Sequence, residues 1–330
     1  MKKHLIIGGC GFIGSVLAHY LSTFEEEVVV ADNFYRNGSE VNKEWLQRKG
    51  ISVIRFDTTQ EDISEFVNLE DFSHIYLLAA QTAVTKSIDD PRFDFNCNLV
   101  GTFNVLESIR KNCKKDNCPV LVFSSTNKVY GHLETTMPTC EEAPLDFYTP
   151  YGCSKGAAEQ YVRDYARIYG IPTVVLRKSC IYGHRQWGTE DQGWLAWFAL
   201  RILQEKEITI FGDGKQVRDL LYVNDLVKLY YKISRNDFSG TAGKIYNVGG
   251  GKENSISLID AIQVLQNIID KEAKVTFSET RPGDQPYFVS SNVLVREELG
   301  WEPGINIESG MRRLVDWLKY ALKNHNNILC

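Results

Sequence analysis

Gly8-Gly9-Cys10-Gly11-Phe12-Ile13-Gly14 follows the short apolar run Leu5-Ile6-Ile7 and opens a predicted helix from about Phe12 to Thr23. Glycines, which lack a Cβ, let a strand turn sharply into a helix and let backbone N–H groups approach a pyrophosphate. Asp32 stands at the end of the next apolar run, where a carboxylate can accept the ribose hydroxyls of a dinucleotide. The negative charge of Asp32 would repel a 2′-phosphate, which favours NAD over NADP. NADP remains an alternative, because Arg36 lies close in sequence.

Apolar runs recur along the chain, separated by segments of helical length. This alternation is typical of a parallel sheet with crossover helices. We therefore predict an α/β fold, a Rossmann doubly wound parallel sheet, with a smaller, interleaved C-terminal substrate domain. The predicted dinucleotide domain takes residues 1–177 and about 222–250, and the substrate domain takes about 178–221 and 251–330. The predicted strands after the first are Val28–Ala31, Ser52–Phe56, His74–Leu78, Val120–Phe123, Thr173–Leu176 and Tyr246–Gly250.

Further helices are predicted where apolar residues recur three and four positions apart. The two long ones, Phe95–Lys115 and Ser154–Tyr169, are expected to cover the sheet and to leave part of each stripe for a subunit interface. Two more are predicted near Leu258–Ile269 and Met311–Leu322, in the smaller domain.

Length and charge narrow the classes of function. The chain has 330 residues with 42 acidic and 37 basic side chains, a net charge of −5, and no lysine and arginine block. Nucleic acid is therefore not expected as a partner. No apolar stretch reaches the roughly 18 residues of a membrane helix. Glycines from Gly8 onward interrupt what would resemble a signal peptide after Met1-Lys2-Lys3. We expect a cytoplasmic protein without a membrane partner.

The eight cysteines are too sparse for a disulfide scaffold in a chain of this length. Cys113 and Cys118 form the one close pair, and no second pair or histidine motif completes a zinc site. Free thiols and no metal site are predicted. The positions are Cys10, Cys97, Cys113, Cys118, Cys140, Cys153, Cys180 and Cys330.

Tyr151 and Lys155 indicate proton-transfer chemistry. A Lys four residues after a Tyr arises by chance about once in such a chain, so position decides, and this pair lies after the strand that ends in Ser124-Ser125-Thr126. One helical turn separates the two side chains, so the ammonium of Lys155 can stabilise a phenolate. Lowering the pKa of a tyrosine from about 10 to near neutrality takes roughly 4 kcal/mol. Thr126 would hold a substrate hydroxyl while Tyr151 takes its proton and the carbon gives hydride to the cofactor.

These motifs resemble the extended short-chain dehydrogenase/reductases that act on nucleotide sugars, and the resemblance runs over nearly the whole chain. It implies NAD as cofactor, a nucleotide sugar as substrate, and three catalytic residues, Thr126, Tyr151 and Lys155. It also implies substrate contacts from Thr126, Arg218, Arg281 and Asp284, since arginine forks suit phosphate oxygens. The implied cofactor contacts are Gly8, Gly11, Phe12, Ile13, Gly14, Asp32, Asn33, Asp57, Thr58, Leu78, Ala79, Ala80, Asn98, Ser124, Tyr151 and Lys155.

The residues after Thr126 discriminate within that family. Sugar 4,6-dehydratases carry an Asp-Glu pair there for elimination, and this chain has Asn127-Lys128. Together with Arg185-Gln186-Trp187-Gly188, the string resembles the CDP-tyvelose 2-epimerases, also called CDP-paratose 2-epimerases. That resemblance implies C2 inversion of a CDP-linked dideoxyhexose through a 2-keto sugar, in lipopolysaccharide or capsule biosynthesis. One departure from the wider epimerase pattern is Cys180, where many relatives place an Asn on the substrate diphosphate.

Three other functions stay open. A UDP-sugar 4-epimerase uses the same three catalytic residues with the sugar rotated in its pocket. A binding module that kept the dinucleotide fold and lost its chemistry would lack Tyr151 or Lys155, and both are present. A net reductase would consume NADPH. The resemblance also implies a homodimer or homotetramer built on the two long helices.

Overall fold

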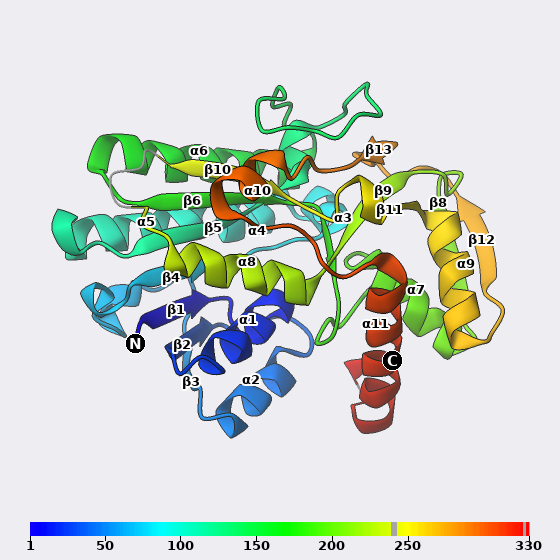
Figure 1. Cartoon of the computed structure of the whole chain (residues 1–330), viewed down its shortest axis with the longest axis horizontal. Coiled ribbons are helices and arrows are strands. Elements are labelled where there is room, and N and C mark those ends of the chain that lie inside the picture. Colours follow the sequence, from blue (N-terminus) through cyan, green and yellow to red (C-terminus); the bar gives the residue numbers. More distant parts are fainter. Residues whose placement is uncertain (239–242, 326–327, 330) are drawn as a thin grey trace.

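The structure, a computed structural model, describes residues 1–238, 243–325 and 328–329. Its central strands are β1 (Lys3–Ile7), β2 (Glu27–Asp32), β3 (Ser52–Arg55), β4 (His74–Leu77), β5 (Val120–Thr126), β6 (Thr173–Lys178) and β10 (Lys244–Val248). They form one parallel sheet in the order β10-β6-β5-β4-β1-β2-β3 (Figure 1). Each predicted strand is present in this sheet, which confirms the doubly wound fold.

Helices cover both faces of the sheet, which explains why its strands are continuous apolar runs. On one face lie α5 (Gly101–Asn112) and α6 (Thr149–Tyr169), packed through residues such as Leu106 and Val162. On the other lie α1 (Phe12–Ser22) and α8 (Val223–Arg235), packed through residues such as Leu17. Figure 1 shows α5 and α6 on the side of the sheet opposite α8 and α1.

The two long predicted helices differ from the structure at their ends. The first is divided into α4 (Pro91–Phe95), a π-helical turn (Asn96–Val100) and α5, which ends at Asn112 rather than Lys115. The second, α6, begins at Thr149 rather than Ser154, because Pro150 suits the first turn of a helix. Tyr151 therefore lies inside the first turn of α6.

Segments from two separate parts of the chain form a smaller region beyond the carboxyl end of the sheet (Figure 1). Its strands are β7 (Cys180–Tyr182), β9 (Val217–Tyr222), β11 (Ser255–Ser257) and β13 (Tyr287–Phe288) in one sheet, and β8 (Glu207–Phe211) with β12 (Lys274–Ser278) in another. Its helices include α7 (Trp194–Leu203), α9 (Leu258–Ile269) and α11 (Ile307–Asn324). We propose that this region is the predicted substrate domain.

The remaining α-helices are α2 (Ser39–Arg48), α3 (Val84–Asp89) and α10 (Val293–Leu299).

Two further features bear on the predictions from composition. Among the residues described, no helix combines the length and the apolar character that crossing a bilayer requires. The seven cysteines within the described ranges are free thiols, and Cys330, the eighth, lies outside those ranges.

Candidate active site

Two cavities open beyond the carboxyl ends of the parallel strands. The large cavity, of about 720 Å³, is lined by the glycine turn and by the ends of β2 and β4. The small cavity, of about 370 Å³, is lined by the ends of β5, β6 and β7 and by the smaller region. Both walls include Phe12, Ile13, Ser124 and Lys178. Groups bound in the two cavities can therefore meet at this shared wall.

The glycine turn fits a pyrophosphate in the large cavity. Gly8 has a φ of +83°, and a Cβ there would lie 2.4 Å from the backbone nitrogen of Ala79. A Cβ at Gly14 would lie 2.5 Å from the carbonyl oxygen of Gly8. Helix α1 begins after Gly11 without a side-chain cap, so its first N–H groups are available to an anion. The turn thus combines close backbone approach with a helix N-terminus, as a dinucleotide requires.

Asp32 and Arg36 decide between the two dinucleotides. Asp32 lies in the wall of the large cavity, where its carboxylate accepts hydrogen bonds from the N–H of Cys10 at 2.9 Å and of Phe34 at 2.8 Å. Arg36 donates instead to Thr82 and Gln192, which line both cavities. Because its guanidinium is engaged at the shared wall, it is not a partner for a 2′-phosphate beside Asp32. The geometry therefore favours NAD.

Most predicted cofactor residues lie in the wall of the large cavity, but three lie elsewhere. Tyr151 and Lys155 line the small cavity. Asn98 is wholly buried, and its Nδ2 donates to Asp94 Oδ1 and Ser154 Oγ, each at 3.0 Å. The predicted residues in the wall are Gly8, Gly11, Phe12, Ile13, Gly14, Asp32, Asn33, Asp57, Thr58, Leu78, Ala79, Ala80 and Ser124.

Thr126, Tyr151 and Lys155 come together in the wall of the small cavity. Burial raises the pKa of Tyr151 to about 12, while a hydrogen bond with Thr126 and the charge of Arg36 act to lower it. Burial also lowers the pKa of Lys155 to about 7, and the charge of Lys178 acts in the same direction. The sequence analysis assigned the stabilising charge to Lys155. In the structure the charge of Arg36 also acts on Tyr151, and the Lys155 ammonium lies over the ring of Phe123, 4.2 Å from its centroid.

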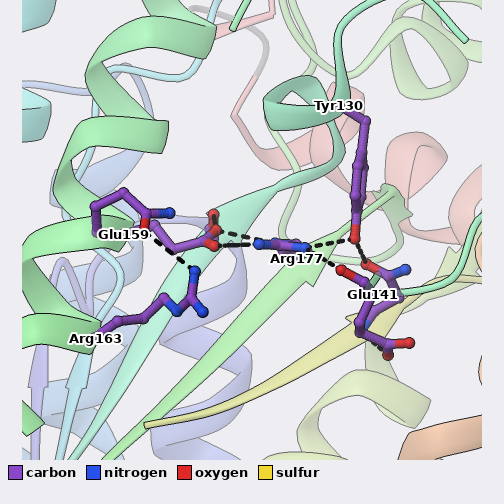
Figure 2. A network of polar contacts seen from close by, with 8 residues as sticks. Tyr130, Glu141, Glu159, Arg163 and Arg177 are labelled. Carbon is purple, nitrogen blue, oxygen red and sulfur yellow. Dashed lines mark hydrogen bonds and ion pairs between the residues drawn. The ribbon is translucent and has the colours of Figure 1, made fainter. Parts of the chain in front are cut away.

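A buried ion pair, which sequence reasoning missed, ties α6 to the strands beside it (Figure 2). The guanidinium of Arg177 on β6 donates from Nε and Nη2 to Glu159 on α6, at 3.0 and 2.5 Å. Glu159 also accepts from Ser125 Oγ at 2.6 Å, and Arg177 Nη1 donates to the Tyr130 hydroxyl at 2.8 Å. The network therefore fixes the helix that carries Tyr151 against the strand that ends at Thr126.

The predicted substrate residues share the wall of the small cavity with the catalytic ones. Arg218 and Asp284 form an ion pair, with 2.5 Å between Nη2 and Oδ1. The guanidinium carbon of Arg281 lies 3.7 Å from the centroid of the Phe211 ring. Cys180 lies in the same wall, where burial raises the pKa of its thiol.

The smaller region also contributes to the wall of the large cavity, through Gln186, Trp187, Thr189 and Gln192. The segment 185–192 packs against α2 and the loop before it, and we call these contacts, of Arg185 with Asn42 and of Trp187 with Gly38, the seam. Arg185 Nη1 donates to Asn42 Oδ1 at 3.2 Å, and a Cβ at Gly38 would lie 2.2 Å from Cδ1 of Trp187. The seam joins residues far apart in sequence, so no local sequence pattern predicted it.

Comparison with known proteins places the chain among enzymes. The model of the NAD dependent epimerase/dehydratase family matches residues 4–249. The chain belongs to this family. It is 38% identical to CDP-paratose 2-epimerase of Salmonella typhi, over 96% of this chain and 98% of that one. It is 32% identical to a putative UDP-glucose 4-epimerase of Methanocaldococcus jannaschii, over 96% and 98%.

A solved structure gives the same assignment. The UDP-glucose 4-epimerase of Thermus thermophilus in complex with NAD matches with a TM-score of 0.86 and 31% identity, over 97% of this chain and 99% of that one. The predicted family, the doubly wound fold and the NAD dependence are confirmed by these matches.

Proposed function

We propose that this enzyme inverts C2 of a CDP-linked dideoxyhexose, interconverting CDP-paratose and CDP-tyvelose. The meeting of Thr126, Tyr151 and Lys155 beside the wall shared by the two cavities carries the proposal. Asn127 and Lys128 follow Thr126 and bond to the neighbouring loop, Asn127 to Gln285 at 3.4 Å. They supply no acid and base pair for elimination. The identity to CDP-paratose 2-epimerase of Salmonella typhi supports the choice of substrate.

The residues of the small cavity divide the reaction between them. Thr126 holds the C2 hydroxyl by hydrogen bond, and Tyr151 removes its proton, while Lys155 and Arg36 supply positive charge. NAD, when bound, supplies reversible hydride acceptance at this carbon. The 2-keto sugar then presents its opposite face, and Tyr151 returns the proton to the oxygen. The net redox change is zero, so no external reductant is consumed.

The experiment is incubation of the purified protein with CDP-paratose, followed by proton NMR of the sugar ring. We expect conversion to CDP-tyvelose without added NADPH. Inertness toward every CDP-sugar would contradict the proposal, and turnover that requires NADPH would indicate a net reductase instead.

A UDP-sugar 4-epimerase is the second candidate. The observation that favours it is the match over nearly the whole chain to the Thermus thermophilus UDP-glucose 4-epimerase. A parallel NMR sample with UDP-glucose distinguishes the two candidate functions. A UDP-sugar 4-epimerase should invert C4 of UDP-glucose and leave CDP-paratose unchanged.

We also propose that the enzyme is a homodimer, or a homotetramer built from such dimers, with α5 and α6 at the interface. Phe103 and Tyr161 are 39% and 45% exposed on these helices, and their ring centroids lie 5.7 Å apart. Exposed aromatic clusters mark association surfaces. Phe103→Glu should therefore shift the mass measured by analytical ultracentrifugation toward the monomer. Phe277→Glu, at a 61% exposed ring on β12, is the control. An unchanged mass for Phe103→Glu contradicts this interface.

The proposal includes a cytoplasmic location and a role in supplying sugars for lipopolysaccharide or capsule. Free thiols such as Cys10 and Cys113 are consistent with a reducing compartment. Fractionation of cells that express the tagged chain checks the location.

A further inference from the structure

Lys128 has no role in the reaction as described so far, yet its side chain lies in the wall of the small cavity. It belongs to the 3₁₀ turn Asn127–Tyr130, directly after Thr126. Its backbone N–H donates to Thr126 Oγ1 at 3.2 Å, and its Nζ donates to the carbonyl oxygen of Gly283 at 3.2 Å. The ammonium is therefore held between the catalytic turn and the loop that carries Arg281 and Asp284.

Among the residues that the structure describes, no carboxylate forms an ion pair with this ammonium. Its wall contains five cationic side chains, Lys128, Lys155, Lys178, Arg218 and Arg281, and three carboxylates, Glu190, Asp191 and Asp284. Each carboxylate already has another partner: Asp284 has Arg218, Glu190 has Arg281, and Asp191 accepts from Thr85 at 2.8 Å. An ammonium has three donor hydrogens, and Lys128 donates one of them to the carbonyl oxygen of Gly283. The wall is therefore suited to an anion beside Lys128.

The neighbours of Lys128 indicate which part of a bound nucleotide sugar it contacts. Under the proposed function Thr126 holds the reacting sugar hydroxyl, and Lys128 stands two residues further on, beside the Arg218–Asp284 pair. In a nucleotide sugar the sugar is attached directly to the second phosphate of the diphosphate. We propose that the Lys128 ammonium binds this second phosphate and selects nucleoside diphosphates over monophosphates. This inference rests on the proposed function and gives a role to a side chain to which neither the resemblance nor the mechanism assigned one.

The charge state of Lys128 gives the contact a pH dependence. Burial and the charge of Arg218 lower the pKa of Lys128 to about 8, while Asp284 and Cys180 act in the opposite direction. These groups face Lys128 from β9, from the loop after β12 and from β7. The ammonium is mostly charged at pH 7 and mostly neutral at pH 9. Affinity for a diphosphate should therefore fall as the pH rises through about 8.

The test is isothermal titration calorimetry of CDP and of CMP with four forms of the full chain, at pH 7 and pH 9. Lys128→Met should weaken CDP binding by about 10- to 100-fold at pH 7 and leave CMP binding unchanged. Lys128→Arg, which keeps its charge, should retain CDP binding and lose the fall between pH 7 and pH 9. Lys215→Met is the matched control, because Lys215 is exposed on the turn before β9 and does not line the small cavity.

Two results overturn the inference. One is wild-type CDP affinity in folded Lys128→Met, and the other is equal weakening of CDP and CMP. Either result leaves the proposed function standing if the wild type still epimerises CDP-paratose. If the wild type turns over UDP-glucose and not CDP-paratose, the proposed substrate fails. The Lys128 contact is then tested by the same comparison with UDP and UMP.

Discussion

Tyr151→Phe should lower the kcat of epimerisation by about 10²- to 10⁴-fold, the range that one acid–base group contributes. The ring of Tyr151 is 8% exposed, so phenylalanine keeps its packing and removes only the hydroxyl that exchanges the proton. The NAD content of the purified protein should be unchanged, because the large cavity is lined by other residues. Proton NMR measures the rate, and nucleotide released by acid measures the bound cofactor.

Tyr161→Phe is the matched control, because Tyr161 lies on the same helix, outside both cavities, and is 45% exposed. It should keep the wild-type rate. A Tyr151→Phe enzyme that retains more than about a third of the wild-type kcat would remove Tyr151 from the proton transfer.

Glu159→Gln should lower the free energy of unfolding by about 3–5 kcal/mol, since it leaves the Arg177 guanidinium buried without a countercharge. The side chains of Glu159 and Arg177 are 0% and 2% exposed, so solvent cannot take over the lost interaction. Urea unfolding followed by circular dichroism measures the change. A loss below about 1 kcal/mol would show that the buried pair contributes no more than a surface pair does.

Glu308→Gln provides the control for this measurement. Glu308 and Arg312 form an ion pair on α11 with side chains 64% and 57% exposed, so its loss should change stability by less than about 1 kcal/mol. Replacing both buried partners, as in Glu159→Leu with Arg177→Met, should restore part of what Glu159→Gln loses, because no uncompensated charge remains.

The central sheet was predictable from the sequence because its strands are buried on both faces. Runs such as Leu5–Ile7 and Val120–Phe123 need apolar residues at every position, which marks them without any knowledge of their neighbours. The strands of the smaller region carry a weaker signal. Strand β12, for example, is mostly exposed, and β7 and β11 have three residues each. Short or exposed strands have no continuous apolar run, so they were not predicted.

The site was predictable wherever its chemistry lies in a local motif. Gly8, Thr126 and Tyr151 belong to short patterns that a strand or a helix places directly, and the structure brings them to adjoining cavities. Contacts between distant segments left no such pattern. Arg36 reaches Gln192 across 156 positions, and Glu159 meets Arg177 across two elements. The contacts of Arg36 and of Arg177 therefore could not be predicted before the fold was known.

The seam between the two halves bears on how the enzyme carries its cofactor. A dinucleotide in the large cavity lies between the glycine turn on one side and Trp187 and Gln192 on the other. The contacts of Arg36 with Gln192 and of Gly38 with Trp187 border this cavity. A cofactor restored to its starting oxidation state in every cycle has no need to leave. The architecture therefore suits NAD held as a prosthetic group and not as a co-substrate drawn from the cellular pool.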